Sequence, residues 1–142
     1  MSFSLATKLV ILFSISYLSL AGKIPIIAIY SNNYPSNDTN PVKSQVGETY
    51  VNWIKASGGE VVVIHSWDSK EYINFVLGEV DGVLFQGGSV SLSLEYSFAT
   101  TANYILKSII ELNDKKIKKI AIWATCLGFE LINNLIEGKD VL

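Results

Sequence analysis

The residue in this chain best suited to covalent chemistry is Cys126, the only cysteine among its 142 residues. It follows the apolar run 120–123 and precedes an apolar pattern with helical spacing, Leu127, Leu131 and Leu135. A strand-to-helix turn of this kind lifts its central side chain above the sheet, as in a nucleophile elbow. The first amides of the helix then face the sulfur and favour the thiolate, which is the reactive form.

A buried structural cysteine would fit the same pattern, because free cysteine is among the most buried residue types. Spacing alone leaves the two roles of Cys126 equally open. A lone cysteine cannot form an internal disulfide, so the fold must be held by its hydrophobic core.

The rest of the chain alternates apolar strands with helical patterns. Strands are expected at 24–30, 61–64, 80–85 and 120–123, a loop at 31–41, and helices at 46–56, 69–77, 92–112 and 129–136. Asp68 or Ser69 is expected to cap the second helix, and Trp123 to be buried in the strand before the turn. This alternation predicts an α/β fold: a doubly wound, mostly parallel sheet with helices on both faces. Active sites in such sheets lie at the carboxyl ends of the strands.

The turn that follows Phe85 supplies what a thiolate nucleophile needs. Attack on an amide carbonyl creates an oxyanion, which is stabilised by amide donors fixed in advance. Gly87 and Gly88 can present backbone N–H groups at close range because they have no side chains. The amide of Leu127, first in the elbow helix, is a second donor. Taken alone, the glycine pair is an ordinary turn.

Two segments resemble the signature segments of gamma-glutamyl hydrolases, namely GVLFQGGSV at 82–90 and WATCLGFE at 123–130. This family belongs to the class I glutamine amidotransferase-like superfamily, which has a flavodoxin-like fold. Residues 50–62 are similar to the family's first helix and second strand, and the resemblance extends from about Ile24 to Gly138.

The resemblance implies a role for each matching residue. Cys126 would be the nucleophile, Gly88 and Leu127 the backbone oxyanion donors, and Glu130 a residue near the substrate's glutamyl group. The implied substrates are small molecules, the folyl poly-gamma-glutamates. Water would resolve a thioester intermediate, with no cofactor and no metal.

The sequence departs from the family pattern in two places near the site and in one larger respect. Gln86 stands where proline is usual, which relaxes a pre-set turn, and Ala124 stands where glycine is usual, which crowds the elbow. No histidine follows Cys126, although a cysteine acyl-transfer enzyme needs one as general base, oriented by an acidic partner. His65, the chain's one histidine, is expected to be a solvated residue and not that base. Residues 23–142 are therefore expected to be the N-terminal part of a domain that is incomplete at its C-terminus.

Residues 1–22 have the pattern of a secretory signal peptide. Lys8 precedes the apolar stretch 9–20, and Ser19 and Ala21 are the small residues of a cleavage site. The stretch is short for a bilayer span, so a stable membrane anchor is not expected and an uncut anchor is the alternative. Secretion implies an extracellular or lysosomal/vacuolar location and an N-glycan on Asn37.

Three functions are compatible with these features. The first is a secreted or lysosomal/vacuolar gamma-glutamyl hydrolase. The second is an inactive, shortened relative that acts as a secreted binding protein. The third is a glutamine amidotransferase domain, which the signal peptide disfavours. A net charge of −2 gives no indication of a nucleic-acid partner. The sequence leaves open whether the protein forms a homodimer.

Signal-peptide cleavage predicts a mature N-terminus at Gly22 or Lys23. N-terminal sequencing of material secreted by a eukaryotic host measures this directly. Secreted protein that still begins at Met1 would contradict the prediction.

Overall fold

The computed structural model of the chain describes residues 22–34, 43–92 and 97–138. The predicted signal peptide and the Asn37 sequon lie outside these residues. Among the residues described, no helix is both long and apolar enough to cross a membrane.

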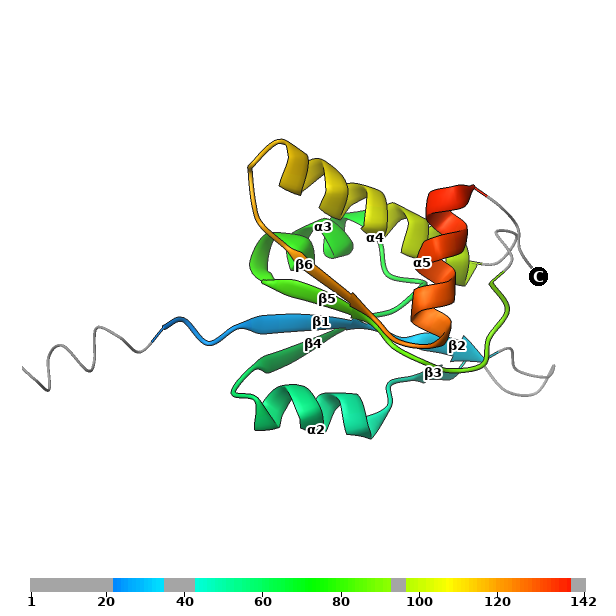
Figure 1. Cartoon of the computed structure of the whole chain (residues 1–142), viewed down its shortest axis with the longest axis horizontal. Helices are drawn as coiled ribbons and strands as arrows, with labels where there is room; N and C mark the ends of the chain where they lie inside the picture. The colour runs from blue at the N-terminus through cyan, green and yellow to red at the C-terminus, as the bar shows by residue number, and fades with distance from the viewer. Residues whose placement is uncertain (1–21, 35–42, 93–96, 139–142) are drawn as a thin grey trace, which may run out of the picture.

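A parallel sheet forms the centre of the described chain (Figure 1). Its strand order is β4-β1-β5-β6, with bounds β1 (Ile26–Tyr30), β4 (Glu60–Ile64), β5 (Gly82–Phe85) and β6 (Ala121–Ala124). In register, Tyr30 lies opposite both Ile64 and Phe85, and Phe85 lies opposite Ala124. The carboxyl ends of all four strands therefore finish level, and the segments that follow them share one edge.

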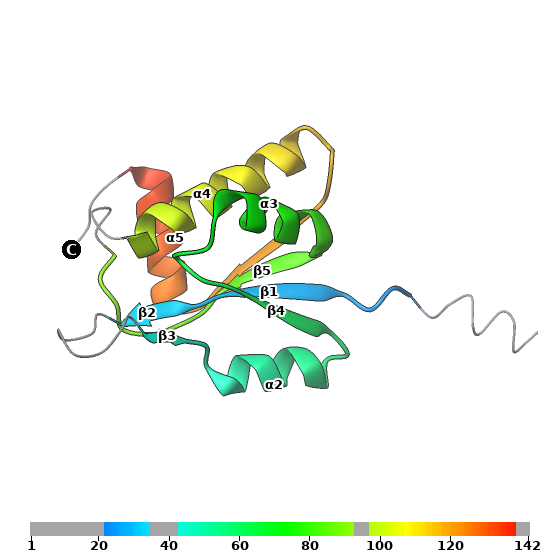
Figure 2. The same cartoon turned by 180° about the vertical axis from the view of Figure 1, so that it is seen from behind.

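Helices cover both faces of this sheet, as the alternating pattern predicts. α2 (Glu48–Ala56) lies alone on one face, and the other face carries α3 (Lys70–Glu79), α4 (Ser97–Asp114) and α5 (Leu127–Glu137) (Figures 1 and 2). The expected doubly wound α/β architecture is confirmed.

The larger core cluster fills the face with three helices. Tyr30 is buried there between Phe85 and Phe98, and its hydroxyl donates a 2.7 Å hydrogen bond to the Phe98 carbonyl. Burial raises the pKa of Tyr30, so the hydroxyl stays protonated and keeps its role as donor. Under α2 the core is smaller and is built on Ile29, Ile54 and Leu84.

The expected helix positions hold, and some of the ends differ by a few residues. Ser69 caps α3 as predicted, because its hydroxyl accepts a 3.2 Å hydrogen bond from the Tyr72 amide. α4 begins at Ser97 and not at Leu92, which is buried but lies outside the helix. Apolar spacing marks the buried face of a helix but does not locate its first turn.

A small antiparallel hairpin stands where the sequence predicts only a loop. β2 (Asn32–Tyr34) pairs with β3 (Lys43–Gln45) beyond the end of β1. Both strands are short and polar, so neither has the apolar alternation by which strands are recognised.

The expected burial of Trp123 is wrong: its side chain is 59% exposed. β6 is an edge strand of the described sheet. α2 lies near β4, the strand at the other edge (Figure 1). Among the described residues the aromatic neighbour of Trp123 is Trp53 of α2, with ring centroids 6.1 Å apart. Between them lies an apolar hollow of about 180 Å³, lined also by Ile122 and Leu84.

Asn113 fixes the point at which the chain leaves α4 and enters β6. Its Nδ2 donates to the Ile120 carbonyl at 2.9 Å, and its Oδ1 accepts from the Ile120 amide at 2.8 Å. We expect Asn113→Ala to lower the free energy of unfolding by about 1–3 kcal/mol, because both Ile120 groups lose their partner. The exposed Asn74, which bonds only the Tyr104 hydroxyl, is the matched control. Equal losses for Asn74→Ala and Asn113→Ala in urea denaturation would refute this role.

Candidate active site

Cys126 lies at a sharp turn between β6 and α5. Its backbone has φ 49° and ψ −119°, and among the described residues only Lys116 is another non-glycine with positive φ. Such a conformation costs on the order of 1–3 kcal/mol and persists only where neighbouring contacts enforce it. The turn leaves the Cys126 side chain exposed. This is the backbone geometry that the sequence predicts for an elbow.

Contacts with the end of β5 enforce this turn. The Thr125 amide donates to the Phe85 carbonyl at 3.1 Å, which extends the strand pairing to the residue before the cysteine. The Gly128 amide then donates to the Thr125 carbonyl at 2.9 Å and starts the helix. A Cβ on Gly128 would lie 2.2 Å from the Phe85 carbonyl oxygen, so only glycine allows α5 to begin against β5.

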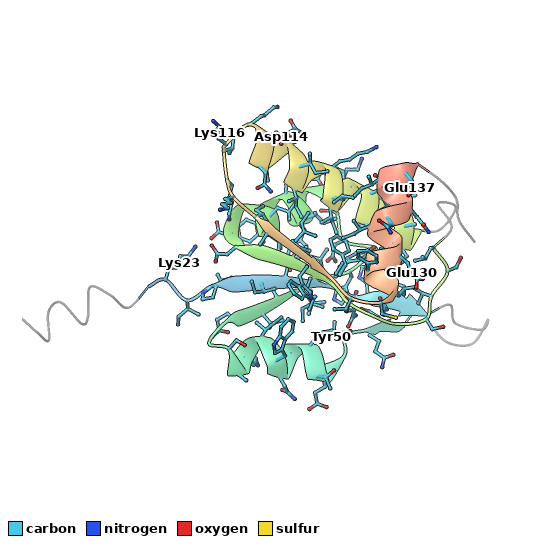
Figure 3. The ribbon with its side chains drawn as sticks, in the orientation of Figure 1. Lys23, Tyr50, Asp114, Lys116, Glu130 and Glu137 are labelled. Carbon is cyan, nitrogen blue, oxygen red and sulfur yellow. The ribbon has the colours of Figure 1, made fainter. Side chains whose placement is uncertain are left out.

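The glycine turn after β5 lies directly against the elbow. A Cβ on Gly87 would be 3.3 Å from the Cβ of Cys126 and 2.9 Å from the hydroxyl oxygen of Tyr50. That hydroxyl accepts a 3.1 Å hydrogen bond from the Gly87 amide and lies 2.9 Å from the Thr125 hydroxyl. Tyr50, labelled in Figure 3, therefore joins the glycine turn to the elbow from α2.

Gln86 ties the same turn to the segment before α2. Its side chain is buried; its Oε1 accepts from the Gly47 amide at 2.8 Å, and its Nε2 donates to the Gln45 carbonyl at 2.7 Å. The sequence predicts a relaxed turn here because glutamine replaces a proline. Where proline would restrain the turn through its ring, the Gln86 side chain restrains it through these two hydrogen bonds.

The backbone amides of Gly88 and Leu127 are the two predicted oxyanion donors. Neither donates a hydrogen bond to any residue that the structure describes. Gly88 is exposed beside the turn, and Leu127 is the first residue of α5. Both amides belong to segments that follow strands at the carboxyl edge of the sheet.

Glu130 lies one helical turn beyond the cysteine. Its amide donates to the Cys126 carbonyl at 3.1 Å, and its side chain is exposed (Figure 3). Residues four apart share one side of a helix, so the Glu130 carboxylate borders the same edge of the molecule as the elbow.

His65 lies at the same carboxyl edge of the sheet as Cys126 but too far along it to serve the cysteine. It follows β4, whereas Cys126 follows β6, and two strands separate them. Three interstrand spacings amount to about 14 Å, which is beyond hydrogen-bond reach. The His65 ring is half-buried: its Nδ1 lies 2.7 Å from the Ser44 hydroxyl, and its ring stacks on Trp67 at 4.8 Å.

Two polar residues of the site were not found from sequence. Tyr50 falls within the segment that resembles the family, but nothing in its spacing pointed to a hydroxyl contact. Asn32 donates from Nδ2 to the Gly87 carbonyl at 2.8 Å, and it comes from the hairpin strand that the sequence did not reveal. No group of three or more potential metal ligands occurs in the part of the chain described.

Comparison with known proteins shows which family this chain is similar to. The sequence profile of the peptidase C26 family matches residues 25–140. Gamma-glutamyl hydrolase B of Dictyostelium discoideum is 26% identical across 99% of this chain. Gamma-glutamyl hydrolases of Bos taurus and Homo sapiens are 29% and 31% identical across 84% and 68% of it. The chain spans only 41%, 37% and 30% of these three relatives, respectively.

The contact at Gly128 predicts a large penalty for one methyl group. In Gly128→Ala the new Cβ meets backbone atoms of Phe85, which cannot rotate away, so α5 must move off β5. We expect a loss of at least about 2–4 kcal/mol in the free energy of unfolding. Gly78→Ala is the matched control, because Gly78 is also helical and has nothing within 4 Å of a Cβ. That change should stabilise the protein by about 0.5–1 kcal/mol. Equal thermal-denaturation midpoints for the two variants would be incompatible with the packing described.

Proposed function

We propose that this chain, which belongs to the peptidase C26 family, carries the nucleophile and oxyanion donors of a gamma-glutamyl hydrolase. The observation that supports this most is the exposed Cys126 on a strained elbow beside two amides, those of Gly88 and Leu127, with no acceptor in the described residues. The gamma-glutamyl hydrolases among its relatives support the bond type.

The proposed chemistry is acyl transfer through a thioester. The Cys126 thiolate attacks the carbonyl carbon of a gamma-glutamyl amide, and the carbonyl oxygen becomes an oxyanion that accepts from Gly88 and Leu127. The C–N bond breaks, and the departing amine takes up a proton from the protonated general base or, without it, from water. Water then attacks the thioester, which releases the gamma-carboxylate and restores the thiolate.

The proposed substrates are folyl poly-gamma-glutamates, small molecules that carry many carboxylates. Glu130 is assigned to the glutamyl group because it lies one turn from the nucleophile on an exposed surface. An amide N–H of the glutamyl chain would be the donor to this carboxylate. The assigned location is the secretory pathway, ending outside the cell or in a lysosome or vacuole.

None of the described residues is assigned the role of general base. His65 is separated from Cys126 by two strands, and the relatives are more than twice as long as this chain. A second candidate function follows from the same observation. With a nucleophile and donors but no histidine near them in the described residues, the chain would act as a secreted binding protein for gamma-glutamyl ligands.

Hydrolysis by the chain itself separates these functions. We expect residues 23–142 to release glutamate from a pteroyl-gamma-oligoglutamate only very slowly, since loss of a triad member removes several orders of magnitude in rate. Added imidazole should accelerate this release by substituting for the missing base, and Cys126→Ser should abolish it.

His65→Ala is the control for this experiment and should leave the rate unchanged. Fast release without imidazole that is lost in His65→Ala would identify His65 as the base. Ligand binding with no imidazole-dependent release would support the binding protein instead.

A further inference from the structure

Gly87 is held by a hydrogen bond on each of the two peptide groups that it joins. The Gly87 amide donates to the Tyr50 hydroxyl at 3.1 Å, and the Gly87 carbonyl accepts from Asn32 Nδ2 at 2.8 Å. Glycine is the residue whose backbone is least restricted by itself. Here two side chains from distant parts of the sequence remove that freedom from both ends of Gly87.

The carbonyl of Gly87 and the amide N–H of Gly88 belong to one planar unit. In a trans peptide these two groups point in opposite directions, and no cis peptide occurs among the described residues. A hydrogen bond that holds the Gly87 carbonyl therefore also sets the direction of the Gly88 N–H. Asn32 is the side chain that holds this carbonyl.

The strand order determines which way the Gly88 N–H is turned. Asn32 follows β1, which lies on one side of β5, and Cys126 follows β6, which lies on the other side. The Gly87 carbonyl faces Asn32 and hence the β1 side. The Gly88 N–H consequently faces the β6 side, where the nucleophile is.

Tyr50 sets the distance between the turn and the elbow. Its hydroxyl contacts both the Gly87 amide and, at 2.9 Å, the Thr125 hydroxyl of the residue before the nucleophile. The space is tight, because a Cβ on Gly87 would be 2.9 Å from this hydroxyl and 3.3 Å from the Cys126 Cβ. Since Tyr50 occupies the Gly87 amide, the next N–H along the chain, that of Gly88, is the one left for an oxyanion.

We propose that Asn32 and Tyr50 are positioning residues that hold the Gly87–Gly88 peptide so that the Gly88 N–H stabilises the oxyanion formed at Cys126. This inference rests on the proposed function, because it assigns these side chains to the oxyanion donor of that site. Neither residue touches the reacting atoms; each acts through the backbone of Gly87.

A comparison of two reactions of the same thiol tests the inference. Acylation of Cys126 by p-nitrophenyl acetate passes through an oxyanion, forms the S–C bond and releases p-nitrophenolate. Alkylation by iodoacetamide displaces iodide and forms no oxyanion. The ratio of the acylation to the alkylation rate constant therefore reports the oxyanion donors and cancels changes in thiol exposure or ionisation. Cys126→Ser gives the background for both reactions.

We expect the ratio to be higher for the native chain than for N-acetylcysteine, which has no oxyanion donors. Asn32→Ala and Tyr50→Phe should each lower the ratio by about tenfold or more, because a misdirected donor loses most of its effect. Asn33→Ala is the matched control from the same strand: its side chain bonds Ser66 and not Gly87, so the ratio should not change. Asn32→Asp keeps the shape of the side chain and removes the donor, which gives a second variant should Asn32→Ala not fold.

The possible results distinguish a failure of the positioning role from a failure of the oxyanion donors. A native ratio above that of N-acetylcysteine that is unchanged in Asn32→Asp and Tyr50→Phe would overturn the positioning role and leave the proposed function standing. A native ratio equal to that of N-acetylcysteine would overturn the oxyanion donors themselves, and the positioning role with them.

Discussion

The close approach of α5 to the end of β5 is the contact on which the rest of the site depends. The Phe85 carbonyl accepts from the Thr125 amide, and the same carbonyl lies where any side chain on Gly128 would have to be. Helix and strand can meet this closely only through glycine. Because the chain must pass from β6 into α5 within this space, Cys126 between them takes a positive φ and its thiol is left on the surface.

The second element of the site is built on the same strand end. Beyond Phe85, the glycine turn is held by Asn32 from β2 and Tyr50 from α2, and the side chain of its own Gln86 bonds the segment before α2. These are hydrogen bonds to backbone groups, which fix direction better than apolar packing does. A strained cysteine and a restrained glycine turn thus lie in contact, as a nucleophile and its oxyanion donors must.

The sequence predicted the parts of this arrangement that depend on apolar periodicity and glycine. Apolar runs located the four parallel strands, helical spacing located the helices, and the order of elements placed Gly88 and Cys126 at one edge. The sequence missed Asn32 because its strand is short and polar. It overestimated the burial of Trp123 because periodicity cannot tell a central strand from an edge strand. The hydroxyl of Tyr50 went unnoticed because side-chain contacts across 75 residues leave no local pattern.

Direct detection of the acyl-enzyme tests the central claim that Cys126 is an acyl-accepting nucleophile at an oxyanion site. The chain would be treated with the gamma-(p-nitrophenyl) ester of glutamic acid, whose leaving group needs no proton, and analysed by intact mass and peptide mapping. The account predicts one gamma-glutamyl group on Cys126, removable by hydroxylamine as a thioester should be. A chain that stays unmodified while iodoacetamide labels Cys126, or a glutamyl group on another residue, would contradict it.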